Sequence, residues 1–146
     1  MATEVAYLDA SAIVKLIADE EESVPLRAWL SQWSAATSSE LALTEVRRAV
    51  DRKRIGRSAA EQTALGSGFA RVLAGLDLVP LDRALLVAAG ELPGAFMGSL
   101  DAIHVVSALT LGDAVAAFVT YDERQAEGAA ACGLESPARG ERLRRR

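Results

Sequence analysis

The chain has 146 residues, of which 51% are hydrophobic and 25% charged, and its formal net charge is −4 at pH 7. This length suits one domain with a sizeable core, and no segment approaches the roughly 18 uninterrupted apolar residues of a membrane span. The lone cysteine, Cys132, cannot form an internal disulfide, and no basic stretch precedes an apolar signal region, so we expect a cytoplasmic protein rather than a membrane protein or a disulfide scaffold.

In the first half of the chain, apolar runs typical of strands alternate with helical patterns. The first predicted strand, at 4–8, ends at Asp9, and Ser11 is expected to cap the next helix. A second strand is expected at 35–38. The predicted helices of this half span 12–18, 19–33, 39–56 and 58–74.

The second half continues the alternation. Strands are predicted at 76–81 and 116–121, with a short final strand from Leu134 to before Pro137. The predicted helices span 82–90, capped by Asp82, 99–111, capped by Ser99, and 123–132. Strands that alternate with helices indicate a parallel sheet covered on both faces, whose binding crevice lies beyond the carboxyl ends of the strands.

Four carboxylates lie at the ends of, or inside, segments that should pack into the core. These residues, here called the acidic quartet, are Asp9, Glu45, Asp101 and Asp122. Asp9 and Asp122 each follow a predicted strand, so both should emerge at the same edge of a parallel sheet. An unpaired buried carboxylate is costly or becomes protonated, so the quartet predicts a bound cation. Oxygen ligands without sulfur suit Mg²⁺, with Mn²⁺ as a substitute.

Each member of the quartet also has a structural explanation of its own. Aspartates after strands are common as caps and turn formers, and Asp101 suits the positive end of a helix. Glu45 could pair with Arg48 or Arg52 on the same helix. The convergence of all four at one edge of the sheet favours a metal site over these separate explanations.

Other polar and aromatic candidates have simpler interpretations. Asp82 also follows a predicted strand, but the succeeding helix indicates a cap. His104, the single histidine, lies amid apolar residues one turn after Asp101, which favours a packed role or one that supports the site over a general base. Trp29 and Trp33 have helical spacing and are expected in the core or an interface, so base stacking should contribute little to recognition.

Basic residues are concentrated in two segments. One follows Glu45 on the same predicted helix, and the other is a tail at 138–146, set apart from the domain at 1–137. The last eight residues carry a formal charge of +4, so the remainder carries −8. Basic stretches beside an acidic centre suit a polyanionic substrate held through a metal, although solvated helix faces are often basic too. Arg47, Arg52 and Arg54 are the predicted phosphate contacts.

Four sequence elements, in this order, resemble the PIN domain and most closely the VapC toxins of bacterial toxin–antitoxin pairs. They are Leu8-Asp9-Ala10-Ser11, Glu45 before a basic helix, Leu100-Asp101-Ala102-Ile103-His104 with Ser107-Ala108, and Thr120-Tyr121-Asp122-Glu123-Arg124. The resemblance runs from about residue 4 to Pro137. It implies a three-layer α/β/α sandwich with a central parallel sheet of four to five short strands, and a Mg²⁺- or Mn²⁺-dependent endoribonuclease.

The resemblance also implies roles and partners. The acidic quartet would be catalytic, with Asp9, Asp101 and Asp122 as metal ligands, while Glu45 either coordinates the ion or orients the attacking water. Ser11 and Thr120 would support the site as hydroxyls. The implied partners are an RNA substrate, a second copy of the chain in a homodimer, and a cognate VapB-type antitoxin that inserts a segment near the acidic site. No role is carried over to the tail.

Two other functions remain open from the residues alone. A non-catalytic acidic pocket could capture a basic antitoxin peptide, although an intact quartet argues against a degenerate member. An aspartate-nucleophile phosphohydrolase would use Asp9, but it would need a second acid where this chain has Ser11.

Overall fold

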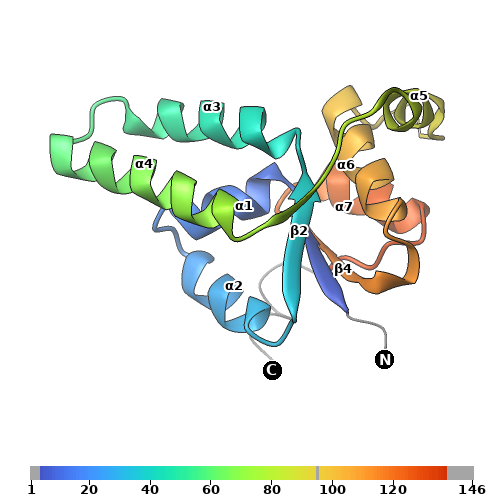
Figure 1. Cartoon of the computed structure of the whole chain (residues 1–146), viewed down its shortest axis with the longest axis horizontal. Coiled ribbons are helices and arrows are strands. Elements are labelled where there is room, and N and C mark those ends of the chain that lie inside the picture. The colour runs from blue at the N-terminus through green and yellow to red at the C-terminus, as the bar shows by residue number, and fades with distance from the viewer. Residues whose placement is uncertain (1–3, 95, 138–146) are drawn as a thin grey trace.

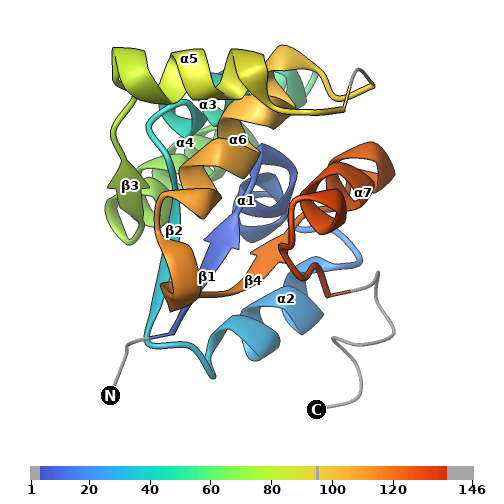
Figure 2. The same cartoon turned by 90° about the vertical axis from the view of Figure 1, so that its right-hand side faces the viewer.

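A parallel sheet organises the structure, a computed structural model that describes residues 4–94 and 96–137. The sheet has four strands in the order β3-β2-β1-β4, and every neighbouring pair is parallel (Figure 2). The strands are Val5–Leu8 (β1), Ala35–Ser39 (β2), Asp77–Val79 (β3) and Val115–Val119 (β4). The predicted basic tail at 138–146 lies outside the described residues.

Helices cover both faces of the sheet, which confirms the predicted three-layer α/β/α sandwich. In Figure 1, α1 to α4 lie on one side of the sheet, and α5, α6 and α7 lie on the other. The helices are Ala10–Ile17 (α1), Ser23–Leu30 (α2), Ala42–Arg54 (α3), Ala59–Ala74 (α4), Arg83–Glu91 (α5), Ser99–Leu109 (α6) and Glu123–Ala131 (α7). A 3₁₀ turn, Gly112–Ala114, precedes β4.

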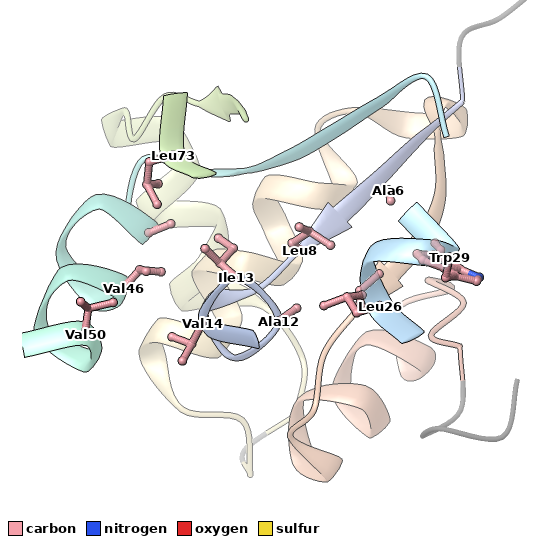
Figure 3. Close-up of a cluster of buried hydrophobic side chains, with 13 residues drawn as sticks. Ala6, Leu8, Ala12, Ile13, Val14, Leu26, Trp29, Val46, Val50 and Leu73 are labelled. Carbon is pink, nitrogen blue, oxygen red and sulfur yellow. The ribbon is translucent and has the colours of Figure 1, made fainter. Parts of the chain in front are cut away.

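The two faces of β1 build two separate parts of the core, because successive strand side chains point in opposite directions. Leu8 packs with Ile13 of α1 and Val46 of α3 in the cluster that Figure 3 shows. Tyr7 points to the other face and packs with Val105 of α6. Fully buried side chains such as Leu8 and Ile13 contribute about 2 kcal/mol each to the stability of the fold.

The final strand predicted at Leu134 is wrong, since this stretch belongs to no strand in the described residues. Leu134 is buried against α6 and α7, and Glu135 accepts one backbone hydrogen bond from Phe118 (2.8 Å). The stretch lies between Gly133, at φ +85°, and Pro137, which has no N–H to donate. The single backbone hydrogen bond to Phe118 does not make a ladder, and Pro137 cannot extend it.

Two predicted helix caps are also wrong, and the differences bear on the site. Asp9, not Ser11, caps α1, because Asp9 is the last extended residue and its side chain accepts from Ala12 N. Gly98, not Ser99, occupies the cap position of α6, and it makes no side-chain bond. The predicted cap at Asp82 is confirmed, since its carboxylate accepts from Leu85 N (2.8 Å).

No helix in the described ranges combines the length and apolar character needed to cross a bilayer. The longest, α4, has 16 residues and begins at Ser58 with a capping box completed by Glu61.

Candidate active site

The order of the strands places a crevice at the carboxyl ends of β1 and β4. From β1 the chain adds β2 and β3 on one side, and later returns to add β4 on the other side of β1. Such a reversal opens a crevice where the helices after the two strands diverge. Leu8 pairs with Val119, and Asp9 N donates to Val119 O (3.1 Å), so the residues that follow both strands lie side by side.

Asp9 is held in this crevice by three hydrogen bonds. Its Oδ1 accepts from Ser11 Oγ (2.6 Å) and from Ala12 N (3.0 Å). Its Oδ2 accepts from Thr120 Oγ1 (2.5 Å). Asp9 is only 5% exposed, so these donors replace most of the water that would otherwise solvate the carboxylate. The structure thus brings the predicted hydroxyls Ser11 and Thr120 onto the first predicted ligand.

Backbone groups fix which way these hydroxyls point. Ser11 Oγ accepts from Tyr121 N (2.9 Å), and Thr120 Oγ1 accepts from Asp122 N (3.0 Å). Each hydroxyl oxygen accepts a hydrogen bond from a backbone N–H. The hydrogen of each hydroxyl is therefore directed at Asp9. Burial raises the pKa of Asp9, and the hydrogen bonds from the two hydroxyls oppose that rise. A nearby cation would offset the burial and keep the carboxylate ionised.

Asp101 lies in the first turn of α6 and is partly buried. Its pKa is raised, first by burial and then by the negative charges of Asp122 and Asp9, with Glu45 adding a smaller contribution. Asp101 is therefore close enough to each of the other three predicted acids for their charges to act on it. Gln125 Nε2 donates to Asp101 O (3.3 Å) and ties α7 to this part of α6.

Asp122 caps α7 at the exposed end of the crevice. Its Oδ1 accepts from Arg124 N (2.9 Å) and Gln125 N (3.2 Å). The capping explanation considered for Asp9 and Asp122 is thus correct for both, and it coexists with their common location at the ends of β1 and β4.

Glu45 reaches the site from α3, and its partner is His104. His104 Nε2 lies 2.6 Å from Glu45 Oε1, and His104 Nδ1 lies 2.8 Å from Tyr7 Oη. The alternative of an ion pair with Arg48 or Arg52 is therefore wrong in the described structure. The prediction that His104 is packed is confirmed, since it is 1% exposed, and its contact with Glu45 is consistent with a role in supporting the site. Sequence reasoning missed Tyr7, although alternation along β1 places it on the face that α6 covers.

The basic residues of α3 divide into two groups. Arg47 and Arg54 pair with Asp51 at 3.1 Å and 3.4 Å, whereas Arg48 and Arg52 form no ion pair with a described residue. Arg48 and Arg52 line a cavity of about 370 Å³ that reaches the site. The lining comprises Ala10, Ser11, Val14, Leu41, Thr44, Glu45, Arg48, Ala49, Arg52 and Leu100. The spacing of Arg48 and Arg52 from Glu45 puts all three on one helix face, a signal that could have identified Arg48 from the sequence.

The donor set fits a hard divalent cation, although the side chains as they stand do not form a closed binding site. In the described part of the chain, no three His, Cys, Asp or Glu side chains converge closely enough to hold an ion. Asp9, Asp101 and Asp122 form no ion pair with a described lysine or arginine, and burial and mutual repulsion raise the pKa of Asp101. Carboxylates without an internal counter-ion are the ligands that Mg²⁺ and Mn²⁺ prefer.

Comparison with known proteins gives a consistent match over most of the chain. The family model of the PIN domain matches residues 6–131. Ribonuclease VapC46 of Mycobacterium tuberculosis (strain ATCC 25618 / H37Rv) is 40% identical over 129 residues, which cover 88% of this chain and 92% of that protein. Ribonuclease VapC47 of M. tuberculosis (strain CDC 1551 / Oshkosh) is 34% identical over 138 residues, with 92% and 96% covered. Ribonuclease VapC35 of the same strain is 34% identical over 142 residues, with 92% and 97% covered.

Proposed function

Because the chain belongs to the PIN domain family, and within it to the VapC ribonucleases, we propose that it is a metal-dependent endoribonuclease and the toxin of a toxin–antitoxin pair. The observation that carries this proposal is the Asp9 carboxylate, which two hydroxyls hold in place near Asp101, whose pKa burial and the charges of Asp122 and Asp9 raise. Asp9 is buried and Asp101 partly buried, and neither has a cation partner among the described residues, so both are costly for the fold unless the site serves a ligand.

Asp9, Asp101 and Asp122 would hold Mg²⁺, or Mn²⁺ in its place, at the ends of β1, β4 and α6. Such an ion, when bound, stabilises negative charge on phosphate oxygens and makes a water more acidic. Ser11 and Thr120 keep the Asp9 carboxylate in one orientation by donating to both of its oxygens. Glu45 approaches from α3 and would either join the ligands or orient the attacking water. No side chain needs to act as a nucleophile.

Arginines of α3 would bind the phosphates of the RNA. Arg52 lines the cavity beside Glu45, as does Arg48, which was not among the predicted contacts. The predicted contacts Arg47 and Arg54 would first have to release Asp51. We therefore assign the main phosphate contacts to Arg48 and Arg52, with Arg47 and Arg54 as secondary ones. Phosphate contacts position an RNA strand without reading its bases.

The proposed partners are a cognate VapB-type antitoxin and a second copy of the chain in a homodimer, acting in the cytoplasm, with 1–137 as the nuclease domain. Exposed apolar side chains such as Leu86, Val87 and Phe96, the last 94% exposed, are consistent with contacts to another protein. Light scattering on the purified protein, alone and with the co-expressed antitoxin, would measure both assemblies.

Cleavage of end-labelled RNA with Mg²⁺, and with EDTA in excess, tests the activity. Cleavage is expected only with the metal, and wild-type rates in excess EDTA would rule out the proposal. The competing function, a non-catalytic acidic pocket that binds a basic peptide, predicts no cleavage under either condition but retained binding of an arginine-rich peptide. An aspartate-nucleophile enzyme would instead form a phosphorylated Asp9, which mass spectrometry would detect.

A further inference from the structure

A buried hydrogen-bond network connects the core of the sheet to the acidic site. It consists of Tyr7 on β1, His104 on α6 and Glu45 on α3, joined at 2.8 Å and 2.6 Å through the two ring nitrogens of His104. Tyr7 is fully buried and His104 is 1% exposed. A histidine that only filled space would need no partner in the site, whereas here both nitrogens are committed and one of them binds a member of the quartet.

The surroundings of Tyr7 determine which groups of the network donate hydrogen bonds and which accept them. Its ring stacks on Phe118, with centroids 5.2 Å apart, and meets the His104 ring edge-on at 5.9 Å. A tyrosine phenol carries its proton at neutral pH, and this one is fully buried. The phenol can then donate to Nδ1 of His104, which leaves Nε2 as the nitrogen that carries hydrogen and faces Glu45 Oε1.

Glu45 needs such a partner more than Asp9 and Asp122 do. Asp9 is fixed by two hydroxyls and a backbone N–H, and Asp122 is fixed as a helix cap. Glu45 has a longer, more flexible side chain, and Arg48 and Arg52 lie on the same face of α3 and line the same cavity. Without His104, the carboxylate could turn to Arg48, which lies three residues further along α3, a spacing at which helical ion pairs form.

We infer that His104, oriented by Tyr7, is a positioning residue that holds the Glu45 carboxylate at the acidic site and away from Arg48. The inference rests on the proposed ribonuclease function for its effect on catalysis. The geometry of the network itself can be tested without measuring RNA cleavage.

Substitutions of His104 separate positioning from packing. In His104→Gln the amide nitrogen can take the place of Nε2 and still donate to Glu45, whereas the shorter amide of His104→Asn reaches only the place of Nδ1. We expect His104→Asn to lower kcat by about 10- to 100-fold, the range for residues that orient a metal site, with KM for RNA little changed. His104→Gln should recover most of that loss. Equal losses in both variants would overturn the inference.

A second comparison tests whether His104 acts through Glu45. In a Glu45→Ala background, His104→Asn should change kcat less than about 2-fold, because the interaction it disrupts is already absent. The same loss in both backgrounds would mean that His104 acts on the fold. Val105→Ala is the matched control, since Val105 is fully buried next to His104 and carries no polar group. It should lower the melting temperature while leaving kcat unchanged at temperatures below unfolding.

The single histidine allows a direct spectroscopic test that needs no RNA. In protein labelled with ¹⁵N-histidine, the ring nitrogens of His104 are the only imidazole signals from the chain. Hydrogen on Nε2 is expected, and hydrogen on Nδ1 alone would overturn the inference, because that ring cannot donate to Glu45. If the expected ring state is found but the wild-type protein cleaves no RNA with metal, the proposed function fails and the assigned catalytic effect of His104 fails with it. If wild type cleaves RNA and His104→Asn cleaves equally well, only the inference about His104 is overturned.

Discussion

Thr120 Oγ1 donates to Asp9 Oδ2 across 111 positions of sequence and joins the end of β4 to the end of β1. The hydroxyl also accepts from Asp122 N, so one atom orients two members of the acidic quartet. Thr120→Val keeps the shape of the side chain but cannot donate, and it leaves one oxygen of a buried carboxylate unpaired. We expect a loss of about 10- to 100-fold in RNA cleavage. Thr120→Ser should retain most of the rate, and equal rates for both variants in a gel assay would contradict this role.

Replacing an aspartate of the quartet with asparagine should lower the rate of RNA cleavage far more than the same replacement at an aspartate outside the site. Asp9→Asn and Asp101→Asn should each lower kcat by at least about 100-fold, because a lost ligand removes charge stabilisation in the transition state. Asp82→Asn is the control, since asparagine also caps helices well and Asp82 caps α5. Initial rates with saturating Mg²⁺ measure the difference. A wild-type rate for Asp101→Asn would exclude it from the site.

Metal binding should stabilise the fold, because the quartet repels itself without a cation. Mg²⁺ at about 100 times its dissociation constant would add roughly 2.7 kcal/mol to the free energy of unfolding if it binds only the native state. Asp101→Asn should raise the stability of the metal-free protein and reduce the gain from Mg²⁺, since its carboxyl is the one whose pKa the neighbouring acids raise. Thermal melts of both proteins with and without Mg²⁺ measure these effects. A melting temperature that neither Mg²⁺ nor Mn²⁺ changes would contradict the prediction.

Away from the site, Glu20 should make part of the stability dependent on pH. It pairs with Lys15 and with Lys53 (2.5 Å), which hold its pKa below the ordinary value. A lowered folded-state pKa stabilises the native state above the unfolded-state pKa of about 4.3, and the contribution disappears as pH falls through the folded value. Glu20→Gln should therefore lose at most about 1 kcal/mol at pH 7 and almost nothing in acid. Urea titrations at pH 7 and at acidic pH measure this difference, and an equal loss at both would refute it.

Features that depend on local rules can be predicted from this sequence, whereas contacts between elements that are distant in the chain cannot. The positions of Asp9 and Asp122 follow from strand patterns and from the geometry of parallel sheets, which are local rules. The contact between Glu45 and His104 depends on how α3 and α6 approach each other across the edge of the sheet, and no spacing within one element encodes that approach. The sequence does not distinguish a cap at Asp9 from one at Ser11, because both residue types favour caps, and only the backbone shows where the strand ends.

The division of the basic residues of α3 gives the last prediction. Arg48 and Arg52 line the cavity beside Glu45, whereas Arg47 and Arg54 pair with Asp51 on the exposed surface. Each lost phosphate contact should flatten the dependence of log affinity on log salt by about 0.7 for single-stranded RNA. Replacing Arg48 and Arg52 with glutamine should therefore lower the slope by about 1.4, with no change in the preferred sequence.

The matched control replaces Arg47 and Arg54 with glutamine, which removes the same charge from the same helix. Its slope should change much less, because these side chains already have Asp51 as a partner. Filter binding at several salt concentrations measures both slopes, with Asp9→Asn in every protein to keep the RNA uncut. Equal changes in the two double variants would show that RNA responds to the total charge of α3, and would reject the cavity beside Glu45 as the path of the phosphates.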